Sequence, residues 1–316
     1  MEKIRFGCYI YQEGLEYEDI KRIVIECERL GFDSVWLKDN FIPWLQAYIS
    51  GWNINEKQTM LECWTTLSSL AAITKRIRLG AILVNLYRNQ SILAKMVSTL
   101  DVISNGKLEF GLSAGWYERE FEAYGITFPK GSVRVGMLEE SITIIKKMLT
   151  QHQVSFKGKY YSIAKAVCNP KPIQKPCPPI WIGGGGKKTL QLAAKHADAW
   201  NYGLCTYDKY VDKLSFLKDC CKVIDRNHEG MVKGWQGVML LGKDKEELRS
   251  KMDILVKGVW ESSGLVIAGT PEKILKEIER YVSIGVNYFT INYLDLPELR
   301  SLQLFAKNII PHFRNY

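Results

Sequence analysis

The feature that most constrains the fold is a repeated alternation of short apolar runs with longer amphipathic segments along the whole chain. The short runs have the continuous apolar character of strands in a buried sheet. Between them, apolar residues recur at helical spacing, as Leu138, Ile142, Ile145 and Leu149 do. The eight expected strands are 4–10, 34–37, 77–84, 108–112, 180–182, 199–202, 238–241 and 288–292.

Eight strand–helix units predict an α/β protein, a (β/α)8 TIM barrel with insertions that forms one domain over residues 1–316. A doubly wound open sheet is the alternative built from the same units. In a barrel, the chemistry lies on the loops that follow the strands. A small hairpin is expected around 156–161. The long loops and insertions are 38–59, 113–133, 151–178 and 242–270.

Composition narrows the class of protein further. The hydrophobic share of 47% and the charged share of 24% are typical of a globular protein with a full core. The net charge of +9 comes from basic residues that are interleaved with acids, so we expect no nucleic-acid partner and at most one basic pocket for an acidic small molecule. No apolar run approaches the roughly 20 residues of a membrane helix. The first residues enter a strand-like run directly, and we therefore expect a cytoplasmic protein without a membrane partner.

The cysteines and histidines do not form a metal motif. The eight cysteines include no Cys-x-x-Cys pair, and the four histidines include no His-Glu-x-x-His pattern. We therefore expect no metal, and reduced thiols that lie largely in the core.

A glycine-rich turn is the clearest candidate for ligand binding. Gly183, Gly184, Gly185 and Gly186 follow an apolar run and precede a helical pattern that opens with Lys187-Lys188. Glycines let a ligand approach the backbone, and a helix start offers free N–H groups that attract anions. The sequence thus predicts a phosphate site here, with a glycine-rich surface loop as the plainer alternative.

Nine short motifs occur along the chain, and their order carries more weight than any one of them. They are 31–39 (GFDSVWLKD), 60–67 (MLECWTTL), 87–90 (YRNQ), 93–95 with 99–101 (LAK, TLD), 103–107 (ISNGK), 114–118 (AGWYE), Arg134 with 138–140 (LEE), the glycine loop with 197–201 (ADAWN), and 269–272 (GTPE). In this order they resemble the bacterial luciferase-like superfamily over nearly the whole chain, and most closely its branch of oxidoreductases that use the deazaflavin coenzyme F420.

The resemblance implies a luciferase-like TIM barrel that transfers a hydride between coenzyme F420 and a small organic substrate. The cofactor phosphate is expected at the amides of the glycine loop. Two other functions remain open: an FMN-dependent monooxygenase that uses oxygen, and a non-catalytic cofactor-binding protein. Relatives of this type are often homodimers, and the apolar faces of the early helices are the expected interface.

By position, the resemblance assigns the cofactor contacts. It implies a non-proline cis peptide bond between Ile82 and Leu83, although both residues also fit a core strand. Asn85, just beyond them, is an expected polar contact. The remaining cofactor-binding candidates are Asp39, Trp44, Gly115, Trp116 and the four glycines of the loop.

Two departures from the family pattern affect the proton chemistry. Asn40 occupies the position where similar enzymes usually carry histidine, and an amide does not titrate. Trp116 replaces a second acid that some relatives carry. Asn40, Glu13 and Glu62 are the catalytic candidates, with Tyr11 and solvent as further proton sources; Glu62 is equally well explained as a helix cap.

Aromatic residues and one arginine complete the candidate set. Trp44, Trp52 and Trp116 are expected on loops over the site, where they stack on a planar ring or line an apolar pocket. Arg134 is expected either near an anionic cofactor tail or in an ion pair with Glu139 or Glu140. By contrast, Trp36, Trp181 and Trp200 lie in or at expected strands and belong to the core.

Overall fold

The computed structural model describes residues 3–44, 58–255 and 266–314, with no side chains described for 253–255, and its main sheet contains nine strands. The strand order is β10-β9-β11-β1-β2-β3-β4-β7-β8, and an additional pairing of β9 with β8 closes the ring into a parallel barrel. All eight expected strands are present, so the predicted TIM barrel is confirmed. The strands are β1 Arg5–Ile10, β2 Ser34–Lys38, β3 Arg78–Val84, β4 Leu108–Ser113, β7 Ile180–Gly183, β8 Ala199–Gly203, β9 Val232–Leu241, β10 Val266–Gly269 and β11 Tyr288–Tyr293.

Helices follow most of the strands, as the alternation requires. A separate antiparallel hairpin joins β5 Gln153–Lys157 to β6 Ser162–Val167 and confirms the hairpin expected there. The helices described are α1 Tyr17–Leu30, α3 Cys63–Ile73, α4 Gln90–Ile103, α5 Glu118–Ala123, α6 Gly131–Thr150, α7 Lys187–His196, α8 Tyr207–Val223, α9 Lys245–Leu255, α11 Pro271–Val282, α12 Arg300–Asn308 and α13 Ile310–Arg314, together with the short 3₁₀ helix η1 Asn85–Tyr87.

The chain divides into two compact units. The first comprises Met1–Thr66, Asn201–Ser215 and Val232–Tyr316, and the second comprises Leu67–Trp200 and Phe216–Met231. That all of 1–316 forms one domain therefore stays a prediction.

In the first unit, β1 lies between β2 and β11, and all three strands are buried almost throughout. Their aromatic side chains form much of the core, with Phe6 stacked on Phe289 at 5.6 Å between ring centroids. The helix α1 ends at Gly31, whose φ of 83° is a left-handed conformation that glycine adopts without steric cost. Trp36 is fully buried, as expected.

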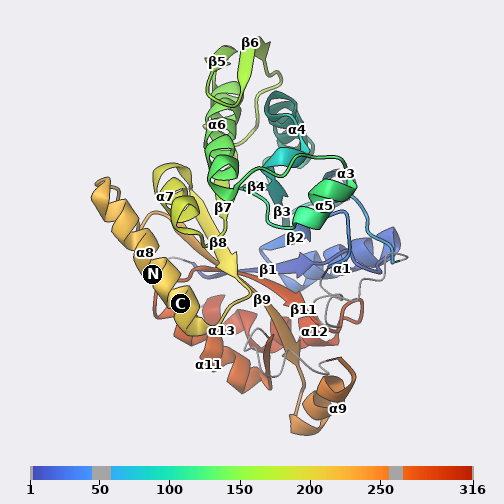
Figure 1. Cartoon of the computed structure of the whole chain (residues 1–316). Helices are drawn as coiled ribbons and strands as arrows, with labels where there is room; N and C mark the ends of the chain where they lie inside the picture. The colour runs from blue at the N-terminus through green and yellow to red at the C-terminus, as the bar shows by residue number, and fades with distance from the viewer. Residues whose placement is uncertain (1–2, 45–57, 256–265, 315–316) are drawn as a thin grey trace. The chain divides into compact units, whose positions relative to one another are not determined.

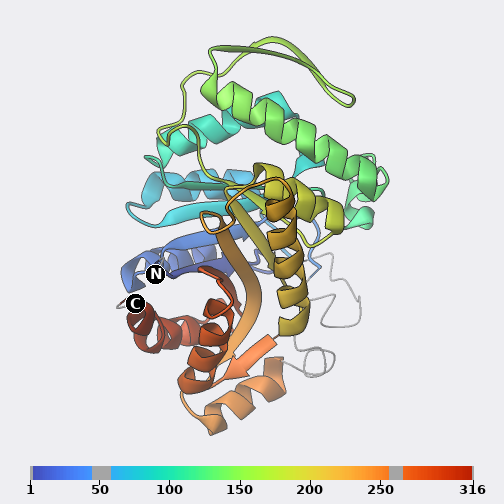
Figure 2. The same cartoon turned by 90° about the vertical axis from the view of Figure 1, so that its left-hand side faces the viewer.

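The loop expected at 242–270 contains more structure than its sequence suggests. It holds α9, and the four-residue strand β10 pairs in parallel with the carboxyl end of β9 from Val266↔Val238 to Gly269↔Leu241. Figures 1 and 2 show β9 as a long, curved strand with α9 beyond its carboxyl end. The sequence prediction missed β10 and the first half of β9.

In the second unit, the β5–β6 hairpin lies along α6 (Figure 1). One carboxylate of α6 fixes its turn, because Glu140 accepts hydrogen bonds from the backbone N–H groups of Lys159, Tyr160 and Tyr161 at 2.6–3.0 Å. A Cβ on Gly136 would meet the Tyr160 ring at 2.8 Å, so glycine at this position allows the close approach.

Several chain-wide expectations bear on the described residues. All eight cysteines are outside disulfides, and most are buried. No group of three or more histidine, cysteine, aspartate or glutamate side chains in the described part of the chain is arranged to hold a metal. None of the helices in the same described ranges has both the length and the apolarity that crossing a bilayer requires.

Candidate active site

A cation lies buried among aromatic rings at the carboxyl ends of β1 and β2. The Lys38 side chain is 4% exposed and pairs with the carboxylate of Glu13, which is 5% exposed. The Lys38 ammonium also lies 4.6 Å from the centroid of the Trp44 ring and 5.2 Å from that of Tyr11. We call these four residues and Asn40 the Lys38 cluster. A buried charge is tolerated only when it is paired, and cation–π contacts add to the pairing.

The Lys38 cluster fixes the residue that replaces the family histidine. The Trp44 indole donates to Asn40 Oδ1 at 3.1 Å, and the Trp44 backbone N–H donates to Glu13 Oε1 at 3.1 Å. Asp39, also buried, lies close enough to help raise the pKa of Tyr9, although burial is the larger cause. The predicted residues Glu13, Asp39, Asn40 and Trp44 thus lie together at one end of the sheet of the first unit.

A line of polar side chains adjoins the cluster in the same unit. Asn201 Nδ2 donates to Gln236 Oε1 at 2.9 Å, and Gln236 Nε2 donates to the Tyr11 hydroxyl at 3.3 Å. Burial raises the pKa of Tyr11 far above its usual value, so the hydroxyl stays protonated at neutral pH. Among the described residues, Asn201 Oδ1 has no hydrogen-bond partner although the side chain is buried. An unsatisfied buried acceptor of this kind is suited to a ligand or a water molecule.

Glu62 acts as a helix cap. Its carboxylate accepts the backbone N–H groups of Trp64 at 3.1 Å and Thr65 at 2.6 Å, at the start of α3. Such a contact satisfies amides that lack an intrahelical partner. The geometry therefore supports the alternative explanation of Glu62 over a catalytic role, which stays untested.

In the second unit, the glycine loop has the features of an anion site. Gly186 is the N-cap of α7, and no side chain at that position caps the first amides of the helix. The first turn carries Lys187 and Lys188 and contains no acidic residue. The indole of Trp200 donates to the carbonyl of Gly184 at 2.9 Å and holds that peptide plane. In a trans peptide the N–H points opposite to the C=O, so the Gly185 N–H points away from the Trp200 indole. The loop thus presents backbone donors and positive charge together.

Ile82 and Leu83 differ from the expectation. Among the described residues, the cis peptide bonds all precede proline, and the bond between Ile82 and Leu83 is trans. The predicted cis bond is therefore wrong; the physical reason is that β3 continues its regular ladder, with Ile82↔Gly111 and Leu83↔Leu112. Leu83 is fully buried, whereas the Ile82 side chain lies against Gly183, where an added Cβ would meet it at 2.8 Å.

Asn85 is buried at the carboxyl end of β3, but on the side next to α6. Neither its amide nitrogen nor its oxygen makes a well-formed hydrogen bond within the described residues. It lies near the Tyr161 hydroxyl, whose pKa is raised by burial and lowered less strongly by Ser141 and Asn85. Asn85 therefore belongs to a buried polar group formed by η1, α6 and the hairpin, and its role as a cofactor contact stays a prediction.

The loop after β4 supplies the remaining candidates. Gly115 has a φ of 75°, and Trp116, which is 54% exposed, stacks on Tyr117. Arg134 lies over the Phe128 ring at 3.8 Å and donates to the Gly115 carbonyl at 3.5 Å. Burial lowers the pKa of Arg134, and its Nε has no hydrogen-bond partner in the described part of the chain.

The expected ion pair of Arg134 with Glu139 or Glu140 is wrong. Glu139 pairs with Lys195 at 2.7 Å and with His196, and Glu140 holds the hairpin turn. Arg134 is thus left beside Gly115, where the alternative assignment to an anionic group stays open. Trp181 and Trp200 are buried as expected, and Trp52 lies outside the described residues.

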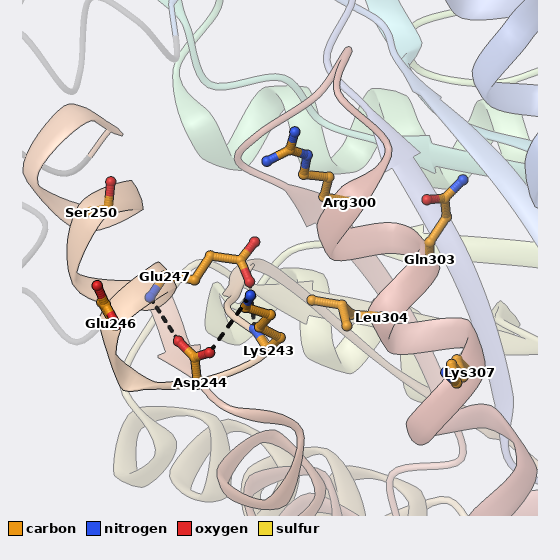
Figure 3. A pocket seen from close by; sticks show the side chains of 9 residues that line it. All are labelled: Lys243, Asp244, Glu246, Glu247, Ser250, Arg300, Gln303, Leu304 and Lys307. Atoms are coloured by element: carbon orange, nitrogen blue, oxygen red, sulfur yellow. Dashed lines mark hydrogen bonds and ion pairs between the residues drawn. The ribbon is translucent and has the colours of Figure 1, made fainter.

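A surface hollow of about 660 Å³ lies between α9 and α12 (Figure 3). Asp244 and Glu247 bond within its wall, since the Glu247 N–H donates to Asp244 Oδ1 and the Lys243 N–H donates to Glu247 Oε2, each at 2.9 Å. None of the predicted site residues lines it, and its charges are mixed. We therefore assign it no role in the chemistry. Its lining residues are Lys243, Asp244, Glu246, Glu247, Ser250, Arg300, Gln303, Leu304 and Lys307.

Two residues of the site were missed from the sequence. Lys38 was part of a motif but was not considered for chemistry, and Gln236 carried no local signal. A period of two from Ser34 through Trp36 to Lys38 places all three side chains on one strand face, and that pattern indicates a buried lysine.

Comparisons with known proteins place this chain in a family. Residues 3–263 match the model of the luciferase-like monooxygenase family. An F420-dependent glucose-6-phosphate dehydrogenase of Amycolatopsis mediterranei is 25% identical over 98% of this chain and 99% of its own length. A solved F420-dependent secondary alcohol dehydrogenase in complex with an F420–acetone adduct has a TM-score of 0.83 at 20% identity, covering 97% of this chain and 98% of its own. A riboflavin lyase with modified FMN and substrate riboflavin has a TM-score of 0.83 at 14% identity, covering 99% and 92%.

The family match spans well over half of the sequence, and the chain belongs to the luciferase-like monooxygenase family. It is a luciferase-like oxidoreductase. The solved structures, all below 25% identity, support the fold alone.

Proposed function

We propose that the protein is an F420-dependent oxidoreductase that transfers a hydride between the deazaflavin and a small organic substrate. The observation that carries the proposal is the glycine loop, whose backbone donors, two lysines and acid-free first turn suit the phosphate of such a cofactor. Full-length similarity to F420-dependent dehydrogenases supports the choice of cofactor. When bound, F420 supplies the carbon that accepts or donates the hydride.

The residues of the chain would then have distinct tasks. The amides of Gly184, Gly185 and Gly186 would hold the phosphate, and Ile82 would contact the cofactor beside Gly183. Arg134, whose Nε has no described partner, suits an anionic tail. Asn201 Oδ1, which has no partner among the described residues, would accept a hydrogen bond from a ligand donor.

An FMN-dependent monooxygenase is the second candidate, because a flavin phosphate suits the same loop and a structural neighbour contains modified FMN. A non-catalytic cofactor-binding protein is the third, because Asn40 cannot titrate.

Titration of the purified protein with F420 and with FMN tests the proposal. We expect F420 to bind and to be reduced with propan-2-ol or glucose 6-phosphate as a probe. Tight FMN binding without F420 binding would contradict it. If F420 binds without turnover, and activity arises only on Asn40→His substitution, the non-catalytic alternative is supported.

We also propose that the protein is a homodimer and that α4 forms the interface. Ile92, Met96, Thr99 and Ile103 lie at helical spacing on one face of α4, and Ile92 and Ile103 are 59% and 48% exposed. Exposed apolar faces of this kind are typical of sites that another protein covers.

A further inference from the structure

Lys38 lies at the carboxyl end of β2, on the same strand face as Ser34 and Trp36. On β2, the Trp36 indole donates to Ser34 Oγ at 2.9 Å, and Ser34 Oγ also accepts the hydroxyl of Tyr288 from β11 at 2.8 Å. Side chains two residues apart share a face, so Lys38 follows Ser34 and Trp36 on it. It is the last residue of β2, at the end where barrel enzymes carry their chemistry.

The ion pair of Lys38 with Glu13 is not required to hold the strand ends together. Gln12 already joins them, because its Nε2 donates to the Lys38 carbonyl at 2.9 Å and its Oε1 accepts the Lys38 N–H at 2.9 Å. Gln12 Nε2 also donates to the carbonyl of Leu61 at 3.2 Å. Burying a lysine and a glutamate is costly, and an apolar pair of the same volume is often at least as stable. A structural role alone therefore does not explain the charges.

The groups around Lys38 stabilise its charged form and fix the position of the ammonium. Glu13 supplies the opposite charge, and the rings of Tyr11 and Trp44 cover the ammonium. The ammonium has three N–H donors in all, and Glu13 accepts from it. Asn40, at the position of the family histidine, has no proton to give at neutral pH.

We propose that Lys38 is the acid–base residue of this oxidoreductase, with Glu13 as its positioning residue; the inference rests on the proposed function. In the reductive direction, bound reduced deazaflavin would supply a hydride, with both electrons, to the carbonyl carbon of the substrate. Lys38 Nζ gives one proton to the carbonyl oxygen, which becomes a hydroxyl. The neutral amine stays hydrogen-bonded to Glu13 and recovers a proton from solvent. In the oxidative direction, the amine accepts the hydroxyl proton.

Lys251 offers a matched control in the same unit. It is also a largely buried lysine, 13% exposed, and it pairs with Asp295 at 3.0 Å. Lys38→Met, Lys38→Ala and Lys251→Met are compared by thermal unfolding, by F420 titration and by reduction of acetone with reduced F420. Methionine keeps the apolar stem of the side chain and removes only the charge and the donors.

We expect Lys38→Met to bind F420 within about threefold of the wild type and to lose about 10²–10³-fold in kcat, the range of a general acid. Ethylamine should restore part of the rate to Lys38→Ala. Lys251→Met should lose stability and keep kcat. A folded Lys38→Met that binds F420 and reduces acetone at the wild-type rate would overturn the proposal, as would a loss of rate in Lys38→Ala that no amine restores.

A second measurement does not depend on turnover or on variant stability. In protein labelled with ¹⁵N-lysine, the Nζ signal of Lys38, assigned by its loss in Lys38→Met, should shift when oxidised F420 is added, and that of Lys251 should not. An unchanged Lys38 signal in a protein that binds F420 would overturn the role of Lys38 alone. A wild-type protein that binds no F420 would instead overturn the proposed function and remove the basis for Lys38.

Discussion

At the scale of single residues, one glycine of the binding loop has a backbone conformation that is rare for other residues, and one charged side chain, that of Lys38, is buried among aromatic rings. Gly184 has a φ of 126°, a conformation that side chains with a Cβ rarely adopt, and a Cβ there would lie 3.3 Å from Thr189 Cγ2. The run of four glycines in the sequence predicts an unusual backbone conformation at this position. The burial of Lys38 could not be anticipated in this way, because the rings that cover it come from two separate loops.

The first prediction concerns Gly184. Gly184→Ala should weaken F420 binding about tenfold, because strain of about 1–3 kcal/mol distorts the peptide planes that point donors at the phosphate. Fluorescence titration with F420 measures the effect. Gly125→Ala is the control, since Gly125 also has a positive φ of 66° but nothing within 4 Å of an added Cβ. Equal F420 affinity of both variants would contradict the assignment.

At the scale of elements, the sequence predicted what local pattern controls. The eight strands of the ring and the hairpin followed from apolar runs and spacing. The strand β10 was missed because four residues carry too little pattern, and only its pairing with β9 makes it a strand. The cis bond at Ile82–Leu83 came from resemblance alone, and the ladder with β4 overrules it.

The second prediction concerns how α1 joins α12. Glu26 accepts two hydrogen bonds from Arg29 at 2.7 Å and one from Gln303 at 2.9 Å, and the Arg29 guanidinium chiefly lowers its pKa to about 2. A carboxyl whose pKa is lowered by folding stabilises the protein above its unfolded pKa of about 4.3. That stability is lost as the pH falls from there towards 2.

Glu26→Gln should therefore lower the free energy of unfolding by about 1 kcal/mol at pH 7, since Arg29 is largely exposed and water screens the pair. The difference from the wild type should shrink steadily below pH 4. Urea unfolding of the wild type and the variant at pH 7 and at pH 2.5 measures the difference. Glu18→Gln is the control on the same helix, because Glu18 and Lys21 form an exposed pair. A deficit as large at pH 2.5 as at pH 7 would contradict the charge-based explanation.

At the scale of the whole molecule, the fold class was predictable and the full site was not. The alternation predicted a barrel, with an open sheet as the alternative, and the ordered motifs indicated the family. Parts of the long loops 38–59 and 242–270 lie outside the described residues. Sequence patterns indicate where chemistry occurs in a barrel, but pairwise contacts such as Asn201–Gln236 form only on folding.

The third prediction concerns assembly. Ile92→Glu should convert a homodimer into a monomer, because a charge buried without a partner in an apolar interface costs several kcal/mol. Sedimentation velocity of the wild type and the variant measures it. Val223→Glu is the control, since Val223 is 85% exposed on α8, away from the apolar face of α4. A wild-type protein that sediments as a monomer, or an Ile92→Glu dimer, would contradict the α4 interface.

The hydrogen bond from Trp200 to Gly184 has a consequence for engineering this protein. The indole that orients the loop belongs to the neighbouring strand and donates to a loop carbonyl, so a library designed around ligand-contacting positions would leave it out. Replacing Trp200 by phenylalanine would keep a ring in the core while releasing the peptide plane. Changing the affinity for a coenzyme would then begin with a residue that supports the binding loop without contacting the coenzyme itself.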